Sequence, residues 1–436
     1  MNSVVRIDSL DQEGRGVARV DGKVTFVERA LPGETVEIRI WRRKPSFDLA
    51  DVVRIVQPSA LRATPPCPHY ERCGGCSLQH LDARAQVASK QRTLEESLAR
   101  LGRVQPEQML APIHGPAWGY RQRARLAVRY VAQKGGVLVG FHEKRTHFVV
   151  DMNSCAVLSP RLSALIMPLR NLLSAMQLAA RIPQVELAAG EAVVAMTVRV
   201  LDPPGEHDLA RLRAFAREHD LDLYLQPGGP DSLRALQPEQ PRPLFYRLPE
   251  FDLELHFRPA DFTQVNYAVN AALVQRALAL LEVRPGQRLA DLFCGLGNFT
   301  LALARRGALV VGVEGSAELV ARGEDNARRN GLASRARFRA ADLFAAPQRV
   351  LDELGPLDGM LIDPPRQGAH ALVQALGASA PARLLYVSCN LGTLARDAQV
   401  LVHEKGYRLR AAGVVNMFPH TSHVESVALF ERTGGG

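Results

Sequence analysis

The sequence predicts an α/β protein with a doubly wound, Rossmann-like parallel sheet, preceded by a small OB-like β-barrel and a mixed, strand-rich central domain. Residues 261–436 alternate short apolar runs with helical patterns, which is the rhythm of βαβ units. Residues 1–57 alternate apolar and polar residues with the period of a strand. Residues 58–260 mix both patterns. We therefore expect three domains with these bounds.

Composition agrees with a globular protein that has a substantial core. The chain has 436 residues, of which 47% are apolar and 23% are charged. Its first residues lack the apolar run of a signal peptide, and we find no stretch that is apolar and long enough to span a membrane. We expect a soluble, cytoplasmic protein without a membrane partner.

The positive charge is unevenly distributed. Residues 84–147 carry twelve Lys or Arg against four Glu, which is nearly the whole net charge of +9. Arg121, Arg123, Arg125 and Arg129 would project from one face of a strand. Such a face suits a polyanion such as RNA, although a solvated surface strand would show the same pattern.

In the barrel, strands are expected at 24–27, 36–40 and 51–56. Residues 41–44, Trp-Arg-Arg-Lys, place an aromatic ring among three cations, a combination that stacks bases and holds phosphates. The region resembles the TRAM domain of RNA-modifying enzymes. A small barrel with another interaction role is the alternative.

Three cysteines are clustered after the barrel. Cys67, Cys73 and Cys76 follow a C-x5-C-x2-C spacing, and two glycines before Cys76 let the backbone turn so that thiolates converge. Cys155 is the only other cysteine outside the C-terminal region. Four thiolates suit zinc or a [4Fe–4S] cluster, and zinc sites more usually show two C-x-x-C pairs.

The regular elements are expected as follows. In the central domain we expect helices at 81–104, 161–180 and 207–218, and strands at 124–131, 137–141, 193–200 and 253–257. In the last domain we expect strands at 288–293, 308–314, 336–340, 359–363 and 384–388, and helices at 298–306, 317–330, 369–378 and 391–403. Segments 407–415 and 426–431 follow without a helix between them, and we expect an antiparallel hairpin at the sheet edge.

A cofactor site is expected where the strands end. Residues 291–298 close a strand and open a helix, and Gly295 permits a tight turn with close approach of a ligand. Glu314 ends the next strand, where a carboxylate can accept hydrogen bonds from ribose, and Asp342 is placed to reach an adenine. A dinucleotide fingerprint would need glycine where this chain has Thr300. We therefore favour S-adenosylmethionine over a nicotinamide cofactor.

Cys389 ends the buried strand at 384–388, where a nucleophile would be placed, although a lone cysteine is more often a core residue. Five segments carry a resemblance to a known family: 262–266, 291–299, 363–366, 388–390 and 418–425. In these segments the chain resembles the RNA uracil-5-methyltransferase family, and the resemblance extends over essentially the whole chain. With the barrel and the four cysteines, the chain is most similar to members that act on 23S ribosomal RNA.

The resemblance implies a class I methyltransferase fold and the transfer of a methyl group to C5 of a uridine. It implies that Cys389 adds to C6 of the uracil, that Glu425 accepts the C5 proton, and that Asp363 lies between cofactor and base. Covalent addition needs a thiolate, so we expect the site to lower the pKa of Cys389.

The resemblance also supplies the binding residues and partners. The implied cofactor contacts are Gln264, Phe293, Gly295, Asn298, Glu314, Asp342 and Asp363. It favours a [4Fe–4S] cluster on Cys67, Cys73, Cys76 and Cys155, which we expect to organise RNA-binding structure. The partner is 23S ribosomal RNA with its uridine turned out of the stack, and the protein is expected to be monomeric.

Some roles stay open at this point. Arg366 is expected to hold either the enolate oxygen or a phosphate, and His420 and His423 are expected to be structural rather than catalytic. A transfer RNA methyltransferase with the same chemistry is one alternative. A non-catalytic RNA-binding or iron–sulfur assembly protein is another, and the presence of both Cys389 and Glu425 argues against it.

Overall fold

The computed structural model describes residues 2–236 and 242–432, which form two compact units. The first unit contains the residues up to Thr93 together with Phe141–Val150 and Phe418–His423. The second contains Leu94–Gly140, Asp151–Met417 and the chain from Val424 onward. The three-domain division expected from the sequence stays a prediction.

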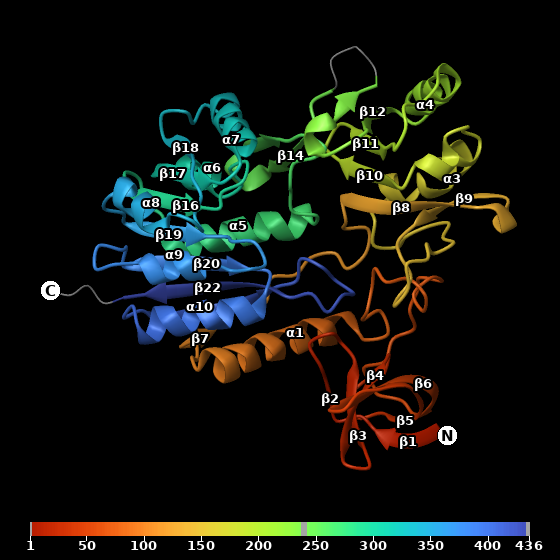
Figure 1. Cartoon of the computed structure of the whole chain (residues 1–436). Helices are drawn as coiled ribbons and strands as arrows, with labels where there is room; N and C mark the ends of the chain where they lie inside the picture. The colour runs from red at the N-terminus through yellow and green to blue at the C-terminus, as the bar shows by residue number, and fades with distance from the viewer. Residues whose placement is uncertain (1, 237–241, 433–436) are drawn as a thin grey trace. The chain divides into compact units, whose positions relative to one another are not determined.

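The first unit begins with the barrel, a six-stranded sheet in the order β1-β5-β6-β4-β3-β2 (Figure 1). Its strands are β1 Asn2–Arg6, β2 Ser9–Leu10, β3 Gly16–Val20, β4 Lys23–Glu28, β5 Thr35–Arg43 and β6 Phe47–Gln57. Alternate apolar residues point inward and form a small core that includes Ile7, Val27 and Ile38. The three strands expected from the sequence lie within β4, β5 and β6.

The helix expected at 81–104 is shorter than predicted. α1 spans Ala83–Ser97 and starts after Asp82, whose carboxylate accepts the N–H groups of Arg84 at 2.9 Å and Ala85 at 3.3 Å. A π-helical turn, Leu98–Gly102, follows, and Arg103 ends it in a left-handed conformation with φ 52°. Residues 98–104 of the predicted helix therefore lie in the π-helical turn and the chain after it, and not in α1.

The second unit contains a mixed sheet in the order β13-β12-β11-β10-β8-β9. Its strands are β8 Arg123–Val131, β9 Gly136–Gly140, β10 Gln184–Ala189, β11 Val194–Arg199, β12 Leu221–Gln226 and β13 Arg234–Ala235. Helix α4, Glu206–Glu218, connects the parallel strands β11 and β12. Strands β10 and β12 were not expected from the sequence.

The prediction of a single helix at 161–180 is wrong. The segment forms α2 Pro160–Ser163, α3 Ile166–Ser174 and a short 3₁₀ turn, Ala179–Arg181. The buried carboxylate of Asp208 accepts the N–H groups of Gln177 and Leu178, each at 2.9 Å. These N–H groups are then not available to continue the helix, so a tertiary contact interrupts the apolar periodicity.

The C-terminal part of the second unit is an eight-stranded sheet in the order β18-β17-β16-β19-β20-β22-β21-β7 (Figure 1). Its strands are β7 Gln108–Met109, β16 Arg288–Leu292, β17 Leu309–Glu314, β18 Ala336–Ala340, β19 Gly359–Ile362, β20 Arg383–Ser388, β21 Arg408–Val415 and β22 Glu425–Glu431. Strands β16 to β20 are parallel, and β21 and β22 form the expected antiparallel hairpin. The doubly wound sheet is confirmed.

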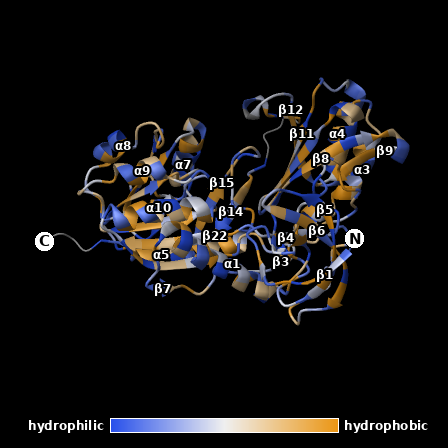
Figure 2. Ribbon diagram, turned by 60° about the horizontal axis from the view of Figure 1, so that its bottom comes forward, coloured by the Kyte–Doolittle hydropathy of each residue, from blue (hydrophilic) through white to orange (hydrophobic). Residues whose placement is uncertain are grey.

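Helices cover this sheet in the manner of a Rossmann-like domain. They are α5 Tyr267–Leu281, α6 Thr300–Arg305, α7 Ala317–Arg329, α8 Pro347–Leu354, α9 His370–Ala375 and α10 Leu391–His403. Helices show both hydrophilic and hydrophobic residues in Figure 2, as expected for elements with one buried face. Helices α5 and α8 were not expected from the sequence. A separate two-stranded sheet pairs β14 Phe245–Leu248 with β15 Leu253–His256.

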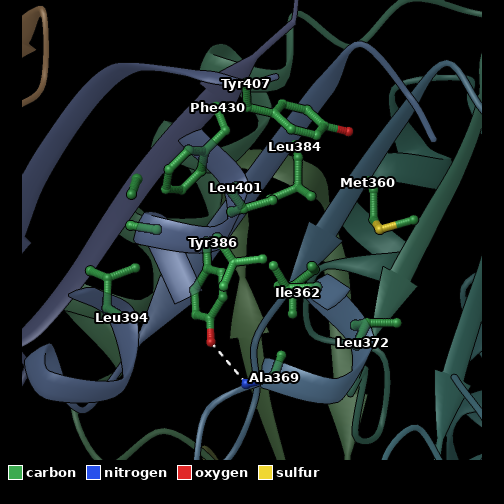
Figure 3. Packing of buried hydrophobic residues seen from close by; sticks show 14 of the residues in the cluster. Met360, Ile362, Ala369, Leu372, Leu384, Tyr386, Leu394, Leu401, Tyr407 and Phe430 are labelled. Atoms are coloured by element: carbon green, nitrogen blue, oxygen red, sulfur yellow. Dashed lines mark hydrogen bonds between the residues drawn. The ribbon is translucent and has the colours of Figure 1, made fainter. Parts of the chain in front are cut away.

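A large apolar core joins α8, α9 and α10 to the middle of the sheet (Figure 3). Tyr386 of β20 is fully buried there, and its hydroxyl contacts the N–H of Ala369 at 3.1 Å and the carboxylate of Asp397 at 2.7 Å. This core fixes where β19 and β20 end. Within the described residues, no helix has the length and apolar character needed to cross a membrane.

Candidate active site

Strand register brings Cys389 and Glu425 to the same point. In the antiparallel pair of β20 and β22, Ser388 lies opposite Ser426. Cys389 directly follows the last residue of β20, and Glu425 is the first residue of β22, directly before Ser426. The charge of Glu425 raises the pKa of the Cys389 thiol, which shows that the two groups are near each other. A thiol and a buried carboxyl group therefore lie at one end of this strand pair.

Asp363 adds a third group at the same edge. It follows β19, the parallel neighbour of β20, and its N–H donates to the carbonyl of Leu292 at the end of β16 at 3.1 Å. Burial, together with the charge of Asp291, raises the pKa of Asp363 to about 7. Asp363 thus lies between the end of β16, which precedes the glycine loop, and Cys389.

The electrostatic surroundings of Cys389 differ from the expectation. Burial raises the pKa of the thiol, the carboxylates of Glu425 and Asp363 raise it further, and the guanidinium of Arg366 opposes them. The expected lowering of the pKa is therefore wrong. The main reason is burial of the thiol, to which the two neighbouring carboxyl groups add.

Asn390 organises the backbone after the thiol. Its side-chain oxygen caps α10 by accepting the N–H groups of Gly392 at 3.0 Å and Thr393 at 3.4 Å. Its amide nitrogen donates to the carbonyl of Arg366 at 3.0 Å. One residue therefore joins the start of α10 to the loop after Asp363, and the Arg366 side chain is left exposed.

The glycine loop after β16 faces open space. Gly295 has φ 56°, and a Cβ atom at this position would meet nothing within 4 Å. Its N–H donates to one oxygen of Glu314 at 3.1 Å, while the other oxygen accepts the N–H of Ser316 at 3.0 Å. A carboxylate has about four acceptor positions. Glu314 can therefore hold the loop and still accept hydrogen bonds from a ligand.

Two aromatic rings lie beside this loop. Phe293 has a left-handed backbone, φ 63°, and its ring packs against Phe344 with the centroids 5.3 Å apart. Phe344 follows Asp342, whose carboxylate accepts the N–H groups of Phe344 and Ala345 and has a lowered pKa because of these bonds. Phe344 was not predicted from the sequence. An aromatic residue two positions after Asp342 was the feature that could have indicated it.

Asn298 belongs to the glycine loop, and Gln264 lies in the segment before α5. The amide of Asn298 exchanges hydrogen bonds with Asn270 of α5 at 2.9 and 3.0 Å and accepts the hydroxyl of Tyr246 at 2.9 Å. Asn298 therefore ties the loop to α5 and β14. Gln264 is half-buried in the segment before α5, whose N-terminus is capped by Asn266.

Asp291, in β16 directly before the glycine loop, is fully buried. One oxygen accepts the hydroxyl of Thr300 at 2.5 Å, and the other has no hydrogen-bond partner. Burial raises the pKa of Asp291 to about 7. Thr300, which the sequence reasoning noted only as a missing glycine, is the partner of this acid.

Comparisons with known proteins agree with this geometry. A family model described as tRNA (Uracil-5-)-methyltransferase matches residues 82–433, and a TRAM domain model matches residues 4–53. The chain belongs to this methyltransferase family. Its Rossmann-like domain is a class I methyltransferase domain, and its N-terminal barrel is a TRAM domain.

Curated relatives of the chain include two proteins named 23S rRNA (uracil(1939)-C(5))-methyltransferase RlmD. The protein of Nitrosospira multiformis is 57% identical over 434 residues, which cover 99% of this chain and 99% of the relative. The protein of Thiobacillus denitrificans is 59% identical over 433 residues, which cover 99% and 100%.

A solved structure similar to this chain is the tRNA (uracil-54, C5)-methyltransferase of Pyrococcus abyssi in complex with S-adenosyl-L-homocysteine. It has a TM-score of 0.74 and 26% identity, with 99% of this chain and 100% of that chain covered.

The cysteines of this family member lie in both units. In the first unit, Cys73 and Cys76 are buried, and the Gly75 N–H donates to the sulfur of Cys73 at 3.4 Å. Segment 141–150 packs on this loop, since the Gly74 N–H donates to the carbonyl of His142 at 2.9 Å. Cys67 is half-buried, and Cys155, in the second unit, is buried.

The donor type at these positions fits a metal cluster, but the arrangement does not by itself form one. Thiolates are the ligands that iron–sulfur clusters and zinc take, and the N–H bond to Cys73 is the kind that stabilises a thiolate. Among residues 2–236 and 242–432, no group of three or more His, Cys, Asp or Glu residues lies in positions that would hold a metal ion.

The two histidines of the last motif are also in the first unit. His420 is buried and contacts Gln86, while the His423 ring packs edge-on against Phe418 with centroids 4.8 Å apart. Both therefore make structural contacts.

The expected basic face is only partly available to RNA. Arg123, Arg125 and Arg129 alternate with buried residues of β8, as predicted, but Arg121 lies before the strand, in an isolated bridge with Leu158. However, the Arg123 guanidinium donates to the carbonyls of Pro259 and Asp261 and holds the segment before α5. Arg123 therefore has a structural role, because these carbonyls lie within its reach.

The aromatic ring of the barrel motif is likewise occupied. In the first unit the guanidinium of Arg145 lies over the Trp41 ring, 4.3 Å from its centroid, and pairs with Asp51 at 2.6 Å. Trp41 keeps 40% of its surface exposed, which leaves part of the ring available for a base.

Proposed function

We propose that this protein methylates C5 of a uridine in 23S ribosomal RNA, at the position that the relatives' names call 1939, and that it uses S-adenosylmethionine. The position of Cys389 and Glu425 at the same end of the paired strands β20 and β22 supports the proposal, because the reaction needs a nucleophile and a base on the same nucleotide. The names of the relatives that cover nearly all of this chain support the substrate.

In this mechanism the Cys389 thiolate adds to C6 of the uracil, and a new S–C6 bond turns C5 into an enolate carbon. When bound, S-adenosylmethionine supplies a methyl group on a positively charged sulfur. C5 takes that methyl group, and S-adenosylhomocysteine is left. Glu425 then accepts the C5 proton, the electron pair reforms the C5–C6 bond, and the S–C6 bond breaks to release Cys389 as the thiolate.

Ionisation of Cys389 is coupled to binding in this proposal. Burial and the carboxylates of Glu425 and Asp363 raise the pKa of the thiol and so disfavour the thiolate. Three influences favour the thiolate in the complex: the Arg366 guanidinium, the N-terminus of α10 that starts after Asn390, and the positive charge of the bound cofactor. The nucleophile is thus activated only when the cofactor is present.

The cofactor is held by residues around the glycine loop. We assign the ribose to Glu314 and the adenine to Asp342 and the Phe293 ring, with Gly295 giving room for close approach. Gln264 and Asp363 complete the site towards the uracil. Asn298 supports the loop through Asn270.

The target uridine is turned out of its stack so that C6 is exposed, at a cost of ~a few kcal/mol. The TRAM barrel and the cations of β8 offset this cost by binding the RNA backbone. We propose that the enzyme acts as a monomer.

We further propose that Cys67, Cys73, Cys76 and Cys155 hold a [4Fe–4S] cluster. The support is the donor type, the burial of three of the four thiols and the N–H donor to Cys73. Anaerobically purified protein is expected to contain about four iron atoms and four acid-labile sulfides per chain. Zinc without sulfide would refute the cluster.

The decisive test is covalent trapping. A 23S RNA fragment in which 5-fluorouridine replaces the target uridine is mixed with the protein and S-adenosylmethionine. Fluorine cannot leave as a proton does, so the reaction should stop at a methylated adduct that maps to Cys389. Methylation of the natural uridine without an adduct on the fluorinated RNA would refute the mechanism.

A transfer RNA substrate is the second candidate, because the solved relative with a TM-score of 0.74 is a tRNA enzyme. The higher identity of the ribosomal RNA relatives favours 23S RNA. Methyl incorporation into separate 23S and transfer RNA, each transcribed without modification, distinguishes the two.

A further inference from the structure

A six-residue segment that precedes Glu425 belongs to the first unit. Residues 418–423 lie in the sequence between β21 and β22, both of which are in the second unit. The carbonyl of His420 accepts the N–H groups of Ser77 and Leu78, each at 2.9 Å, and the Ser422 N–H donates to the Ser77 hydroxyl at 2.9 Å. The chain directly after Cys76 therefore holds this segment.

Gln86 of α1 makes the most specific contacts to the segment. Its side-chain oxygen accepts the N–H of His420 at 2.8 Å, and its nitrogen lies 3.1 Å from Nδ1 of the His420 ring. The same nitrogen donates to the carbonyls of Leu78 at 3.0 Å and Leu81 at 2.8 Å. Gln86 is 1% exposed, so a buried amide uses both of its ends to join α1, the turn after Cys76 and His420.

The segment has a backbone conformation that needs such support. His420 has φ 65°, in the left-handed region that residues with a side chain rarely adopt. One turn of α1 beyond Gln86, the buried Lys90 donates from Nζ to the carbonyl of Phe418 at 2.8 Å. Two buried side chains on one face of α1 thus hold the strained residue and the chain before it, while Ser77 holds the chain after it.

The TRAM barrel contacts the same place. Gly14, in the turn before β3, has φ 79°, and a Cβ atom there would lie 2.7 Å from Leu78 and 3.6 Å from Ser422. The barrel, the cysteine-bearing chain and α1 therefore meet at residues 418–423. Two residues after this segment the chain reaches Glu425, the first residue of β22.

We propose that Gln86 and Lys90 are positioning residues for Glu425. They set the point from which the chain enters β22, and so they control how well the carboxylate reaches the C5 proton. Changes in this part of the first unit should therefore alter the rate of proton removal by Glu425 and leave the rate of thiol addition by Cys389 unchanged. This inference rests on the proposed function, in which Glu425 is the base.

The test compares Gln86→Met, which keeps the length of the side chain but removes both polar ends, with Glu425→Gln. Full-length protein is mixed with S-adenosylmethionine and natural 23S RNA fragment in a single turnover. If Gln86 positions the base, Gln86→Met should form the methylated adduct at the wild-type rate and resolve it about 10-fold to 100-fold more slowly. The adduct should then be visible on a denaturing gel, as it should be for Glu425→Gln.

A double variant separates positioning from general damage. Once Glu425→Gln has removed the base, adding Gln86→Met should change neither the rate of adduct formation nor the lifetime of the adduct. Lys90→Met should behave like Gln86→Met through an independent bond. Ala88→Leu, at an exposed position of α1, should keep wild-type turnover. Thermal unfolding of each variant checks that it is folded.

The outcomes are distinguishable. The positioning role would be overturned if Gln86→Met and Lys90→Met slow adduct formation when they are combined with Glu425→Gln. It would also be overturned if the single variants turn over slowly but accumulate no adduct. If Gln86→Met does not fold, Lys90→Met decides by the same criteria. If Glu425→Gln itself turns over normally and forms no adduct, the proposed base is wrong, which is a failure of the proposed function.

Discussion

Two regions of this protein place reactive side chains in opposite ways. At one end of the Rossmann-like sheet, Cys389 and Asp363 directly follow regular strands and Glu425 begins one, so three neighbouring strands bring them together. In the cysteine-bearing segment of the first unit, Cys73 and Cys76 lie among turns. There, backbone bonds to segments distant in the sequence, such as 141–150 and 418–423, determine the geometry.

The difference shows how far each region should tolerate change. A strand end is supported by a whole core, so a single substitution there should alter chemistry and leave the fold intact. A turn held by a few side-chain bonds should lose its geometry when one bond is removed. The following predictions test this contrast, and each measures one region while the other serves as reference.

The largest effect is expected for Cys389→Ala, which should lower methyl transfer by about 10⁴-fold or more because no other residue replaces the nucleophile. The melting temperature should stay close to that of the wild type. Cys294→Ala is the matched control, since Cys294 is buried against β17 away from the strand-pair end. Equal losses in both variants would contradict the assignment of Cys389.

In the cysteine-bearing segment, Cys73→Ser should release the cluster and lower activity by about 10-fold to 100-fold, as expected when a ligand set is damaged. RNA affinity should fall, while binding of S-adenosylmethionine, measured by calorimetry, should stay within about twofold because the second unit holds it. Cys155→Ser should lose iron in the same way. Iron retention in either variant would exclude that residue as a ligand.

At the glycine loop, Glu314→Gln should weaken binding of S-adenosylmethionine by about 10-fold, because a charge-assisted hydrogen bond contributes ~1.5–3 kcal/mol. Calorimetry gives the dissociation constant directly. Glu318→Gln is the control, since this exposed carboxylate lies at the start of α7 and only contacts Ser316. A similar loss in the control would indicate an effect on α7 and not on the ligand.

The smallest effect concerns ionisation of Cys389. Its pKa is raised, so the midpoint of the pH dependence of alkylation by iodoacetamide should lie above the value of about 8.5 that is usual for a free cysteine. Bound S-adenosylmethionine should move the midpoint down by about one unit, because its positive charge favours the thiolate. Mass spectrometry of the Cys389 peptide measures this. An unchanged midpoint would show that cofactor charge does not activate the thiol.

Much of the second unit was predictable because local rules agree with the final fold there. The apolar strands from β16 to β20, the turn at Gly295 and the position of Glu314 at the end of β17 all follow from short-range pattern and parallel topology. The helix expected at 161–180 failed because Asp208 takes two of its N–H groups. That contact links residues about thirty positions apart, which periodicity cannot reveal.

The sequence by itself determined the fold class, the motifs at the strand ends and the residue types for thiol addition, because these depend on side-chain chemistry and local periodicity. Only the tertiary structure decided which charges surround Cys389, that Arg123 is used internally, and that Gln86 reaches His420. These features depend on residues far apart in the chain. Their energies arise from burial and from direct contact, which exist only after folding.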